Sequence, residues 1–427
     1  MSETTRVRPT EQGVSSLGGP DETLDAHHVH RFVADQLATA DLDGRSLCVL
    51  VPDGTRSCPL PLLVSAIHDA VHGRVSQLTV LIALGTHAAM GDAQLAVHLG
   101  YEPGALADRF PGMEVLNHEW WEPEQLVSLG VIDATRVGEI SEGRLQQEVD
   151  VRLNRAVTEH DVTLIVGPVF PHEVVGYSGG NKYIFPGVAG QEIIDLSHWL
   201  GALIAGGIIG TRGTTPVRAM INEAASMVPS ELLAFCLVVE SGSDRLHSIA
   251  FGEPHAAWES AAAVSAEVHV RYLDTPVRRV VSLIPAKYED IWTGAKGFYK
   301  VEPIVADGGE VILYAPHITE LSAMHPEIAT IGYHNREYFV KQWDRFSHLQ
   351  GSDLAHSVLA TGDGTYDPVD GETKRVTVTL ATAIPEDEVR AVNLDYLDPA
   401  EVDIEAMSAD PDTLVVHRAG EVLYRLR

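Results

Sequence analysis

Four short runs of aliphatic and β-branched residues in the N-terminal half constrain the fold of this chain most strongly. They occupy residues 46–52 (SLCVLVP), 77–84 (QLTVLIAL), 113–116 and 162–166, and a helical pattern follows the first run at 59–71. Short buried strands that alternate with helices are typical of α/β folds built around a largely parallel sheet. The chain is therefore predicted to form such a sheet.

Each of these runs ends in a cluster of polar residues. The clusters lie at residues 53–56 (DGTR), 85–87 (GTH), 117–118 (NH) and 171–172 (PH). In open α/β sheets, ligands bind beyond the carboxyl ends of the strands. The edge of the sheet where these clusters meet is the expected position of a binding site.

The second half of the chain has a pattern of its own. A change of composition at residues 271–278 predicts a linker, followed by strands at 279–284 and 310–315 and a helix at 289–299. We expect a flexible leader at 1–25, an N-terminal α/β domain at 26–270 and a smaller C-terminal α/β domain at 271–427. The predicted fold class is α/β, with two Rossmann-like domains and the active site in the cleft between them.

Charge and hydropathy restrict the partners. A formal net charge of −30 argues against nucleic acid and anionic membranes. No run of about 18 apolar residues could span a membrane, and the polar N-terminus lacks the apolar core of a signal peptide, so we expect a cytoplasmic protein. An anionic small-molecule substrate stays open, because a cleft can be locally positive. Cys48, Cys58 and Cys236 are too few for a disulfide framework and lack zinc-ligand spacing.

A glycine-rich segment carries the strongest local motif. Residues 166–190 read VGPVFPHEVVGYSGGNKYIFPGVAG and place Lys182 directly after a Ser-Gly-Gly-Asn turn. Glycines let backbone N–H groups approach a phosphate closely, and a lysine there can pair with phosphate or bond covalently to a cofactor carbonyl. The spacing matches neither a Walker A loop nor GxGxxG. A plain glycine-rich turn is the alternative interpretation.

Titratable side chains accompany these motifs. His87 and His172 can each act as an acid or a base near neutral pH, and Arg56 can clamp a carboxylate or a phosphate. His198, sixteen positions after Lys182, could bind a metal such as nickel, or could be a satisfied core histidine. The turn at 53–56 could equally serve as a cap for the helix that follows it.

Taken together, these segments resemble the lactate racemase family. The order of the motifs agrees with the family pattern, and the resemblance is dense from about residue 46 to about residue 198 and thinner afterwards. The residues that carry it are Asp53-Gly54-Thr55-Arg56 (the family's DxTR), Gly85-Thr86-His87, Asn117-His118, His172, the block from Gly176 to Lys182, Pro186-Gly187 and His198.

The resemblance implies a nickel-pincer nucleotide, which is pyridinium-3,5-bisthiocarboxylic acid mononucleotide with bound nickel, held by the N-terminal domain. Lys182 would tether it as a thioamide, and His198 would supply a nickel ligand. His87 and His172 would be the paired catalytic acid and base. The other cofactor-binding residues would be Asp53, Gly54, Thr55, Arg56, Ser178, Gly179 and Gly180.

The reaction implied is racemisation or epimerisation of a 2-hydroxy acid by reversible proton-coupled hydride transfer. Arg56 is the first candidate for binding the substrate carboxylate. In the C-terminal domain, Thr293 and Lys296 resemble the family's substrate-contacting helix, but the family typically has Gln where this chain has Thr293. The smaller side chain leaves room for a substrate larger than lactate. His317 and His325 are interpreted as ordinary surface histidines.

Three alternatives stay open at this level. The same cofactor could serve an epimerase of a sugar or aldonic acid. His87, His172 and His198 could instead hold the metal of a zinc-dependent hydrolase, although HExxH is absent, or the protein could carry the cofactor without catalysis. Proteins that synthesise and insert the cofactor are expected partners beside the small-molecule substrate, and homo-oligomer formation is left open.

Overall fold

The structure is a computed structural model, and it describes residues 8–9 and 13–427. Its internal contacts divide the chain into two compact units. Unit 1 comprises residues 1–170, 177–194 and 212–268, and unit 2 comprises residues 171–176, 195–211 and 269–427. Each unit is described by itself below.

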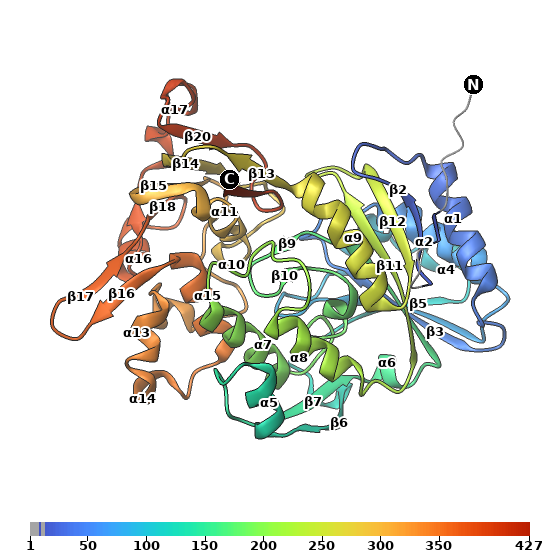
Figure 1. The fold of residues 1–427 in the computed structure, drawn as a ribbon. Helices are drawn as coiled ribbons and strands as arrows, with labels where there is room; N and C mark the ends of the chain where they lie inside the picture. The colour runs from blue at the N-terminus through green and yellow to red at the C-terminus, as the bar shows by residue number, and fades with distance from the viewer. Residues whose placement is uncertain (1–7, 10–12) are drawn as a thin grey trace. The chain divides into compact units, whose positions relative to one another are not determined.

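Unit 1 is built on a sheet of eight strands, in the order β1-β2-β12-β11-β8-β3-β4-β5 (Figure 1). The five strands from β11 to β5 run parallel. β12 pairs antiparallel with β11, and β2 pairs antiparallel with β12. The strands are β1 (Arg8–Pro9), β2 (Ser15–Gly18), β3 (Ser46–Pro52), β4 (Gln77–Ala83), β5 (Met113–Asn117), β8 (Val162–Pro168), β11 (Glu231–Val239) and β12 (Leu246–Gly252).

Helices cover both faces of this sheet (Figure 1). On one face, α1 (Ala26–Thr39) and α2 (Leu60–Val71) bury a core with Val49, Val80 and Leu164 of the strands. On the other face lie α8 (Pro216–Ala225) and α9 (Pro254–His269). The smaller elements of this part of the chain are α3 (Asp92–Leu99), α4 (Leu106–Arg109), α5 (Ala134–Ile140), α6 (Arg155–Thr158) and the hairpin of β6 (Leu126–Ile132) with β7 (Val149–Asn154). The helix α7 (Gln191–Ile204) starts in unit 1, and its residues from Asp195 onward belong to unit 2.

Unit 2 contains a five-stranded sheet that is parallel throughout, in the order β19-β18-β15-β14-β20. Its core joins strand residues such as Val280 and Leu313 to Phe298 and Ala360 of the helices. The strands are β14 (Val277–Leu283), β15 (Val305–Ala315), β18 (Thr377–Thr382), β19 (Asp395–Tyr396) and β20 (Thr413–Val416), and β13 (Val270–Leu273) pairs separately with β21 (Leu423–Leu426).

Short helices and a hairpin complete unit 2. The helices that bear on the site are α10 (Ile291–Gly294), α11 (Lys296–Tyr299) and α15 (Gly351–Thr361). The other elements are α12 (Ile328–Ile331), α13 (Arg336–Val340), α14 (Trp343–Phe346), α16 (Glu386–Ala391), α17 (Ile404–Ala409) and the hairpin of β16 (Gly364–Asp367) with β17 (Gly371–Lys374).

The α/β class and the parallel sheets that the sequence predicts are confirmed, and the four N-terminal strands begin at the residues expected. Four details differ. Part of the expected leader, Ser15–Gly18, is the strand β2, which buries Leu17, whereas residues 1–7 and 10–12 lie outside the described part. The expected linker at 271–278 contains most of β13 and the start of β14, because both strands find a parallel partner.

The third difference concerns the helix expected at 289–299, which forms as two short helices, α10 and α11. Gly297 belongs to the second of these, and a side chain there would meet Ile284 at 2.3 Å. Two segments of the expected N-terminal domain, 171–176 and 195–211, also group with unit 2.

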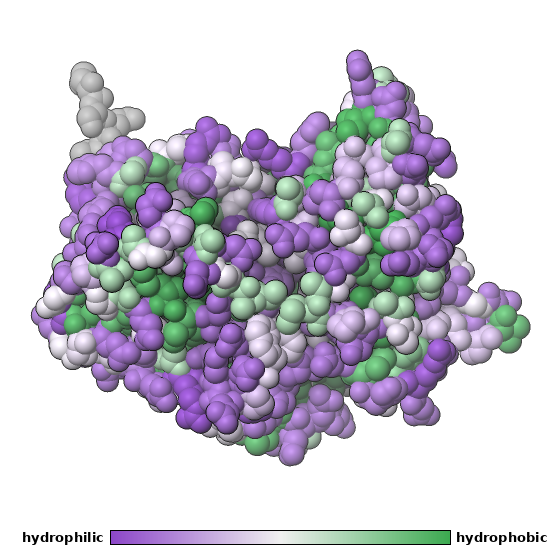
Figure 2. All heavy atoms as spheres, turned by 180° about the vertical axis from the view of Figure 1, so that it is seen from behind, coloured by the Kyte–Doolittle hydropathy of each residue, from purple (hydrophilic) through white to green (hydrophobic). Residues whose placement is uncertain are grey.

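The surface agrees with the acidic composition. Figure 2 shows hydrophilic residues over most of the face that it draws. Within the described residues, no helix combines the length and the apolar character needed to cross a membrane.

Candidate active site

The turn after β3 and the loop after β4 meet at the carboxyl edge of the unit 1 sheet, as the sequence predicts. The Nδ1 atom of His87 lies 2.5 Å from Oδ2 of Asp53. The other oxygen of Asp53 accepts hydrogen bonds from the backbone N–H of Thr55 at 3.1 Å and from its hydroxyl at 2.7 Å. The carboxylate therefore fixes both the turn and the imidazole ring.

Electrostatics favour the ionised form of Asp53. Burial alone would raise the pKa of this carboxyl, but the charges of His87 and Arg56 and the hydrogen bonds from His87 and Thr55 outweigh it and hold the pKa well below its ordinary value. An ionised Asp53 can only accept a hydrogen bond, so Nδ1 of His87 carries the hydrogen. In the neutral ring, Nε2 is then the nitrogen with the lone pair. This is the arrangement in which a carboxylate orients a histidine for proton transfer.

A buried arginine supports the glycine-rich segment from below. The guanidinium of Arg218 on α8 donates to the carbonyl oxygens of Gly179 at 3.0 Å and of Tyr177 at 2.5 Å. It also stacks on the ring of Trp258 at 4.1 Å, and the Trp258 indole N–H donates to Ser178 O at 2.9 Å. Burial lowers the pKa of Arg218 to about 9. Arg218 and Trp258 thus fix the segment through hydrogen bonds to its backbone carbonyl groups.

This geometry changes the reason for the glycines. Gly179 and Gly180 both have positive φ, and a Cβ atom would meet Val169 at 2.5 Å in the first and Trp258 at 2.8 Å in the second. The Ser178 hydroxyl accepts from Phe170 N and donates to Pro168 O. These features serve close packing of the turn, whereas the sequence suggested only an approach to phosphate.

Lys182 lies beside the Asp53 turn within unit 1. It is half-buried in the 3-10 turn Gly180–Tyr183, and its carbonyl accepts from Gly187 N at 3.2 Å. Gly187 O in turn accepts from Gly85 N in the loop after β4 at 3.0 Å. The side chain of Tyr183, which is half-buried, interacts electrostatically with Arg56 and Asp53. Unit 1 therefore brings together His87, the Asp53–Arg56 turn and the lysine segment.

Asn117 and His118 hold the loops around the site. The Asn117 side chain bonds both the N–H and the carbonyl of Met90. His118 is fully buried, with Nε2 on Ala189 O at 3.0 Å and Nδ1 near the Asn154 amide at 3.1 Å. Burial lowers the pKa of His118 to about 4. Both residues therefore hold loops that surround the site.

His172 belongs to unit 2, with different neighbours. Its Nδ1 accepts a hydrogen bond from the backbone N–H of Val174 at 3.1 Å, and Oε2 of Glu173 lies 3.6 Å from the same nitrogen. The hydroxyl of Tyr299 donates to Oε1 of Glu173 at 3.1 Å. The ammonium group of Lys300 donates to Pro171 O at 2.5 Å and lies 3.8 Å from Glu173 Oε2.

His198 lies on the part of α7 that belongs to unit 2, and it is half-buried. Asp195, one turn earlier, accepts hydrogen bonds from the backbone N–H and the hydroxyl of Ser352, which fixes the helix. In the part of the chain that the structure describes, no three His, Cys, Asp or Glu side chains are grouped so as to hold a metal ion. A metal there would need ligands other than a cluster of that kind.

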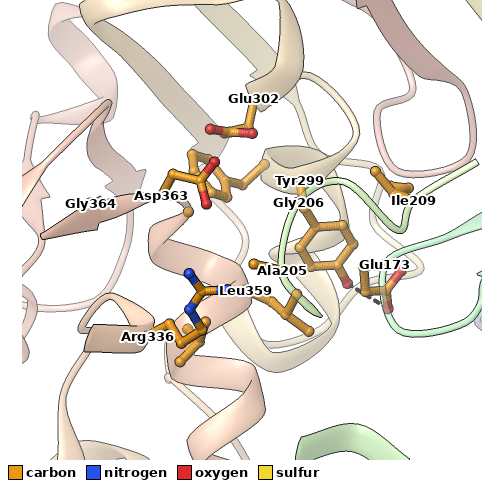
Figure 3. Close-up of a pocket in the computed structure, with 13 residues that line it drawn as sticks. Glu173, Ala205, Gly206, Ile209, Tyr299, Glu302, Arg336, Leu359, Asp363 and Gly364 are labelled. Carbon is orange, nitrogen blue, oxygen red and sulfur yellow. Dashed lines mark hydrogen bonds between the residues drawn. The ribbon is translucent and has the colours of Figure 1, made fainter. Parts of the chain in front are cut away.

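Unit 2 also contains a small cavity behind Glu173, of about 40 Å³ (Figure 3). Tyr299 and Glu173 lie at one end of it, and Arg336, Glu302 and Asp363 line the rest. By its volume the cavity accommodates a few water molecules.

Comparison with known proteins identifies the family. Residues 29–206 match the family described as the lactate racemase N-terminal domain. A lactate racemase from Thermoanaerobacterium thermosaccharolyticum is 25% identical over 158 residues, which is 36% of this chain and 32% of that relative. The chain carries the N-terminal domain of the lactate racemase family. The matched part spans about a third of the length of that relative.

Solved structures share the fold over nearly the whole chain. A crystal structure of a protein from Thermotoga maritima is 32% identical, with a TM-score of 0.86, and the match covers 95% of this chain and 99% of that one. The lactate racemase apoprotein from Thermoanaerobacterium thermosaccharolyticum has a TM-score of 0.69 at 16% identity, covering 94% and 93%. At that identity the second likeness concerns the fold alone.

The region matched to the lactate racemase family includes the strand-end turns, Lys182 and His198, whereas Thr293 and Lys296 lie outside it. Thr293 lies within α10, and its hydroxyl donates to Asp290 Oδ1 at 2.7 Å. Lys296 is buried, with Nζ 5.4 Å from the centre of the Tyr288 ring. Both side chains are therefore fixed by neighbours within unit 2.

A buried cluster beside these residues was missed by sequence reasoning. His325 is 1% exposed and lies 2.9 Å from Asp353, so its interpretation as a surface histidine is wrong, whereas His317 is exposed as expected. The ring of Trp292 stacks between His325 at 3.7 Å and His356 at 4.3 Å. Burial, with the nearby charges of His325 and Lys296, lowers the pKa of His356 to about 3. The helical spacing of Asp353 and His356 was the available signal.

Proposed function

We propose that this protein is an isomerase that racemises or epimerises a 2-hydroxy acid with a lysine-tethered nickel-pincer nucleotide. The observation that carries the proposal is the Asp53–His87 pair at 2.5 Å, beside the Lys182 segment, in a chain that carries the N-terminal domain of the lactate racemase family. A carrier protein would need no histidine oriented by a carboxylate. The sugar-acid epimerase differs from this proposal only in its substrate.

The residues present suit such a cofactor. Lys182 offers an amine on a turn that is fixed through its backbone, and His198 offers an imidazole, which is a suitable ligand for nickel. The Asp53–Arg56 turn and the backbone of Ser178–Gly180 would hold the nucleotide. When bound, the cofactor would accept the hydride of the carbinol carbon and return it. The protein itself supplies orientation and proton transfer.

The protein's part in the reaction follows from its side chains. Arg56 would bind the substrate carboxylate as a fork of donors. Nε2 of His87 takes the hydroxyl proton, and the imidazolium formed keeps its Nδ1–H on Asp53. A planar carbonyl compound then exposes both faces. After this compound has reoriented in the site, a protonated His172 would give its Nε2 proton to the oxygen as the carbinol of the opposite configuration forms.

The substrate side favours a molecule larger than lactate. Thr293 is shorter than the Gln typical of the family, and its hydroxyl is engaged by Asp290. Lys296, placed one turn later, is the proposed second contact with substrate. A sugar-derived or otherwise extended hydroxy acid is therefore the alternative substrate class within the same proposal.

The experiment is expression in a host that makes the cofactor and loads another member of the family. Intact-mass analysis and metal analysis should show a mass increment on Lys182 and about one nickel per chain. Loaded protein is then offered a panel of 2-hydroxy acids, with chiral chromatography of the products. An unmodified chain from that host would contradict the cofactor assignment, and zinc in place of nickel would favour the hydrolase. Co-purified cofactor-insertion proteins would identify the proposed partners.

A further inference from the structure

The hydrogen bond on His172 fixes the position of its proton. A backbone N–H always donates, so Nδ1 must accept the bond from Val174 N with its lone pair. A neutral His172 in this geometry therefore carries its proton on Nε2. His87 is held in the opposite tautomer, because its Nδ1 donates to Asp53.

The proposed reaction requires His172 to accept or donate a proton at Nε2, which the tautomer with its only hydrogen on Nε2 cannot do. To take a proton from a hydroxyl, Nε2 needs a lone pair, so the proton of the neutral ring must sit on Nδ1. To give a proton, the ring must be the imidazolium, which carries hydrogens on both nitrogens. Both working states place a hydrogen on Nδ1, and neither can keep the bond from Val174 N–H.

Glu173 is placed to accept that hydrogen. Its Oε2 lies 3.6 Å from Nδ1, which is about 0.8 Å too long for a charge-assisted hydrogen bond. Its side chain also lines the cavity of about 40 Å³, so it is not closely packed on every side (Figure 3). The Tyr299 hydroxyl, 3.1 Å from Oε1, holds the opposite oxygen.

We propose that Glu173 is the positioning residue of His172: its carboxylate accepts the Nδ1 proton in both working states, as Asp53 does for His87. The proposal rests on the proposed function, in which His172 transfers protons. No bond to substrate involves Glu173, and the proton on Nδ1 is neither gained nor lost during a turnover.

Other charged and titratable groups face this pair from neighbouring elements of unit 2. Tyr299 and Lys300 approach from the end of α11, and His356 on α15 interacts electrostatically with Glu173. The Lys300 ammonium, 3.8 Å from Oε2, favours the ionised carboxylate. The His356 ring is neutral near pH 7 because burial lowers its pKa to about 3. The surroundings therefore keep a negative charge available for Nδ1.

The first experiment uses the full-length chain without cofactor. Nitrogen-15 NMR of labelled histidine, with His172 assigned by its loss in H172Q, reports the tautomer and the pH at which the ring titrates. In E173Q the amide has no charge, so this pH should fall by about one unit or more relative to wild type. E421Q changes another buried carboxylate of unit 2, paired with Lys287, and should leave the His172 titration unchanged.

The second experiment uses the loaded enzyme. E173Q should lower kcat/KM about 10-fold or more and move its pH profile to lower pH, and Y299F should have a smaller effect because it keeps the charge. An E173Q protein that titrates and turns over like wild type would overturn the inference, as would a loss of activity with an unchanged titration and pH profile. A wild-type protein that is loaded but inactive on every hydroxy acid would instead contradict the proposed function, without touching the NMR result.

Discussion

The two predicted catalytic histidines differ in how firmly their surroundings hold them. His87 in unit 1 is bonded to an ionised carboxylate at 2.5 Å, and that carboxylate is itself fixed by Thr55. His172 in unit 2 is bonded to a backbone N–H, and its nearest carboxylate stands 3.6 Å away beside a cavity. The first setting is ready for proton transfer, and the second must adjust.

The difference shows that a sequence motif identifies a candidate histidine but does not show which side chains surround it in the fold. Both histidines end predicted strands, yet only His87 meets its carboxylate from a neighbouring strand. His172 depends on the residue that follows it and on α11, more than a hundred positions later. The proposed reaction acts on two faces of one carbon, and it does not require the same surroundings for both histidines.

The largest expected effect comes from removing either imidazole. H87A and H172A should each lower inversion by on the order of 10²- to 10⁴-fold, because a positioned acid or base contributes that much to the rate. Chiral chromatography with the loaded enzyme measures the loss, and intact mass checks that the modification of Lys182 persists. Activity near wild type in both variants would remove the histidines from the mechanism.

Replacing Asp53 tests the histidine that is held more firmly, His87. In D53N the neutral amide no longer stabilises the His87 imidazolium, so kcat/KM should fall by about 10²-fold or more, further than in E173Q. The matched measurement is the ratio of the two losses under the same conditions. If E173Q proved the more damaging change, the adjustable histidine would be the one that limits turnover, and the ranking argued here would be reversed.

Replacing Arg218 tests how much its hydrogen bonds to the glycine turn contribute to the stability of unit 1. R218M leaves two carbonyls without their donor and removes the stacking on Trp258, and should lower the free energy of unfolding by about 2–4 kcal/mol. Urea denaturation measures it. R218K keeps the charge but loses the fork, and a lysine variant as stable as wild type would show that charge alone suffices.

The last prediction concerns the pH dependence of stability. Each unit contains a buried histidine whose pKa is lowered, His118 in unit 1 and His356 in unit 2. Because the pKa of His118 is about 4 when folded and near 6.5 when unfolded, the unfolded chain binds more protons between these values. The free energy of unfolding should therefore fall by up to roughly 3 kcal/mol as pH drops from about 6.5 to 4. H118Q should flatten this slope in denaturant titrations. His356 in unit 2 acts in the same direction, so a slope unchanged in H118Q would assign the effect elsewhere.

The sequence predicted the strand-end site better than the rest. The runs ending at Asp53 and Gly85 are period-free apolar segments followed by turn residues, and such segments give strands whose carboxyl ends share one edge. The contact between His87 and Asp53 follows from that topology. The association of residues 171–176 with unit 2 could not be predicted, because it depends on Tyr299 and Lys300, which are distant in sequence.

The buried polar cluster of unit 2 was missed for a related reason. His325 lies in an irregular segment, where no periodicity indicates burial. The helical spacing of Asp353 and His356 places them on one face of α15, but it does not by itself show that this face is buried. The roles of the glycines also needed coordinates, since only the positions of Trp258 and Val169 show what a side chain would strike. Partners supplied by tertiary packing leave little trace in a single sequence.

The three cysteines noted at the outset have a practical consequence. All are buried, and burial raises the pKa of Cys48 and Cys236 to about 12 and that of Cys58 further. Their thiols stay protonated at neutral pH and should resist alkylation by maleimides. A single cysteine introduced at an exposed position such as Val97 or Val369 could thus be labelled selectively. Fluorescent or spin probes could therefore be attached without first replacing the native cysteines.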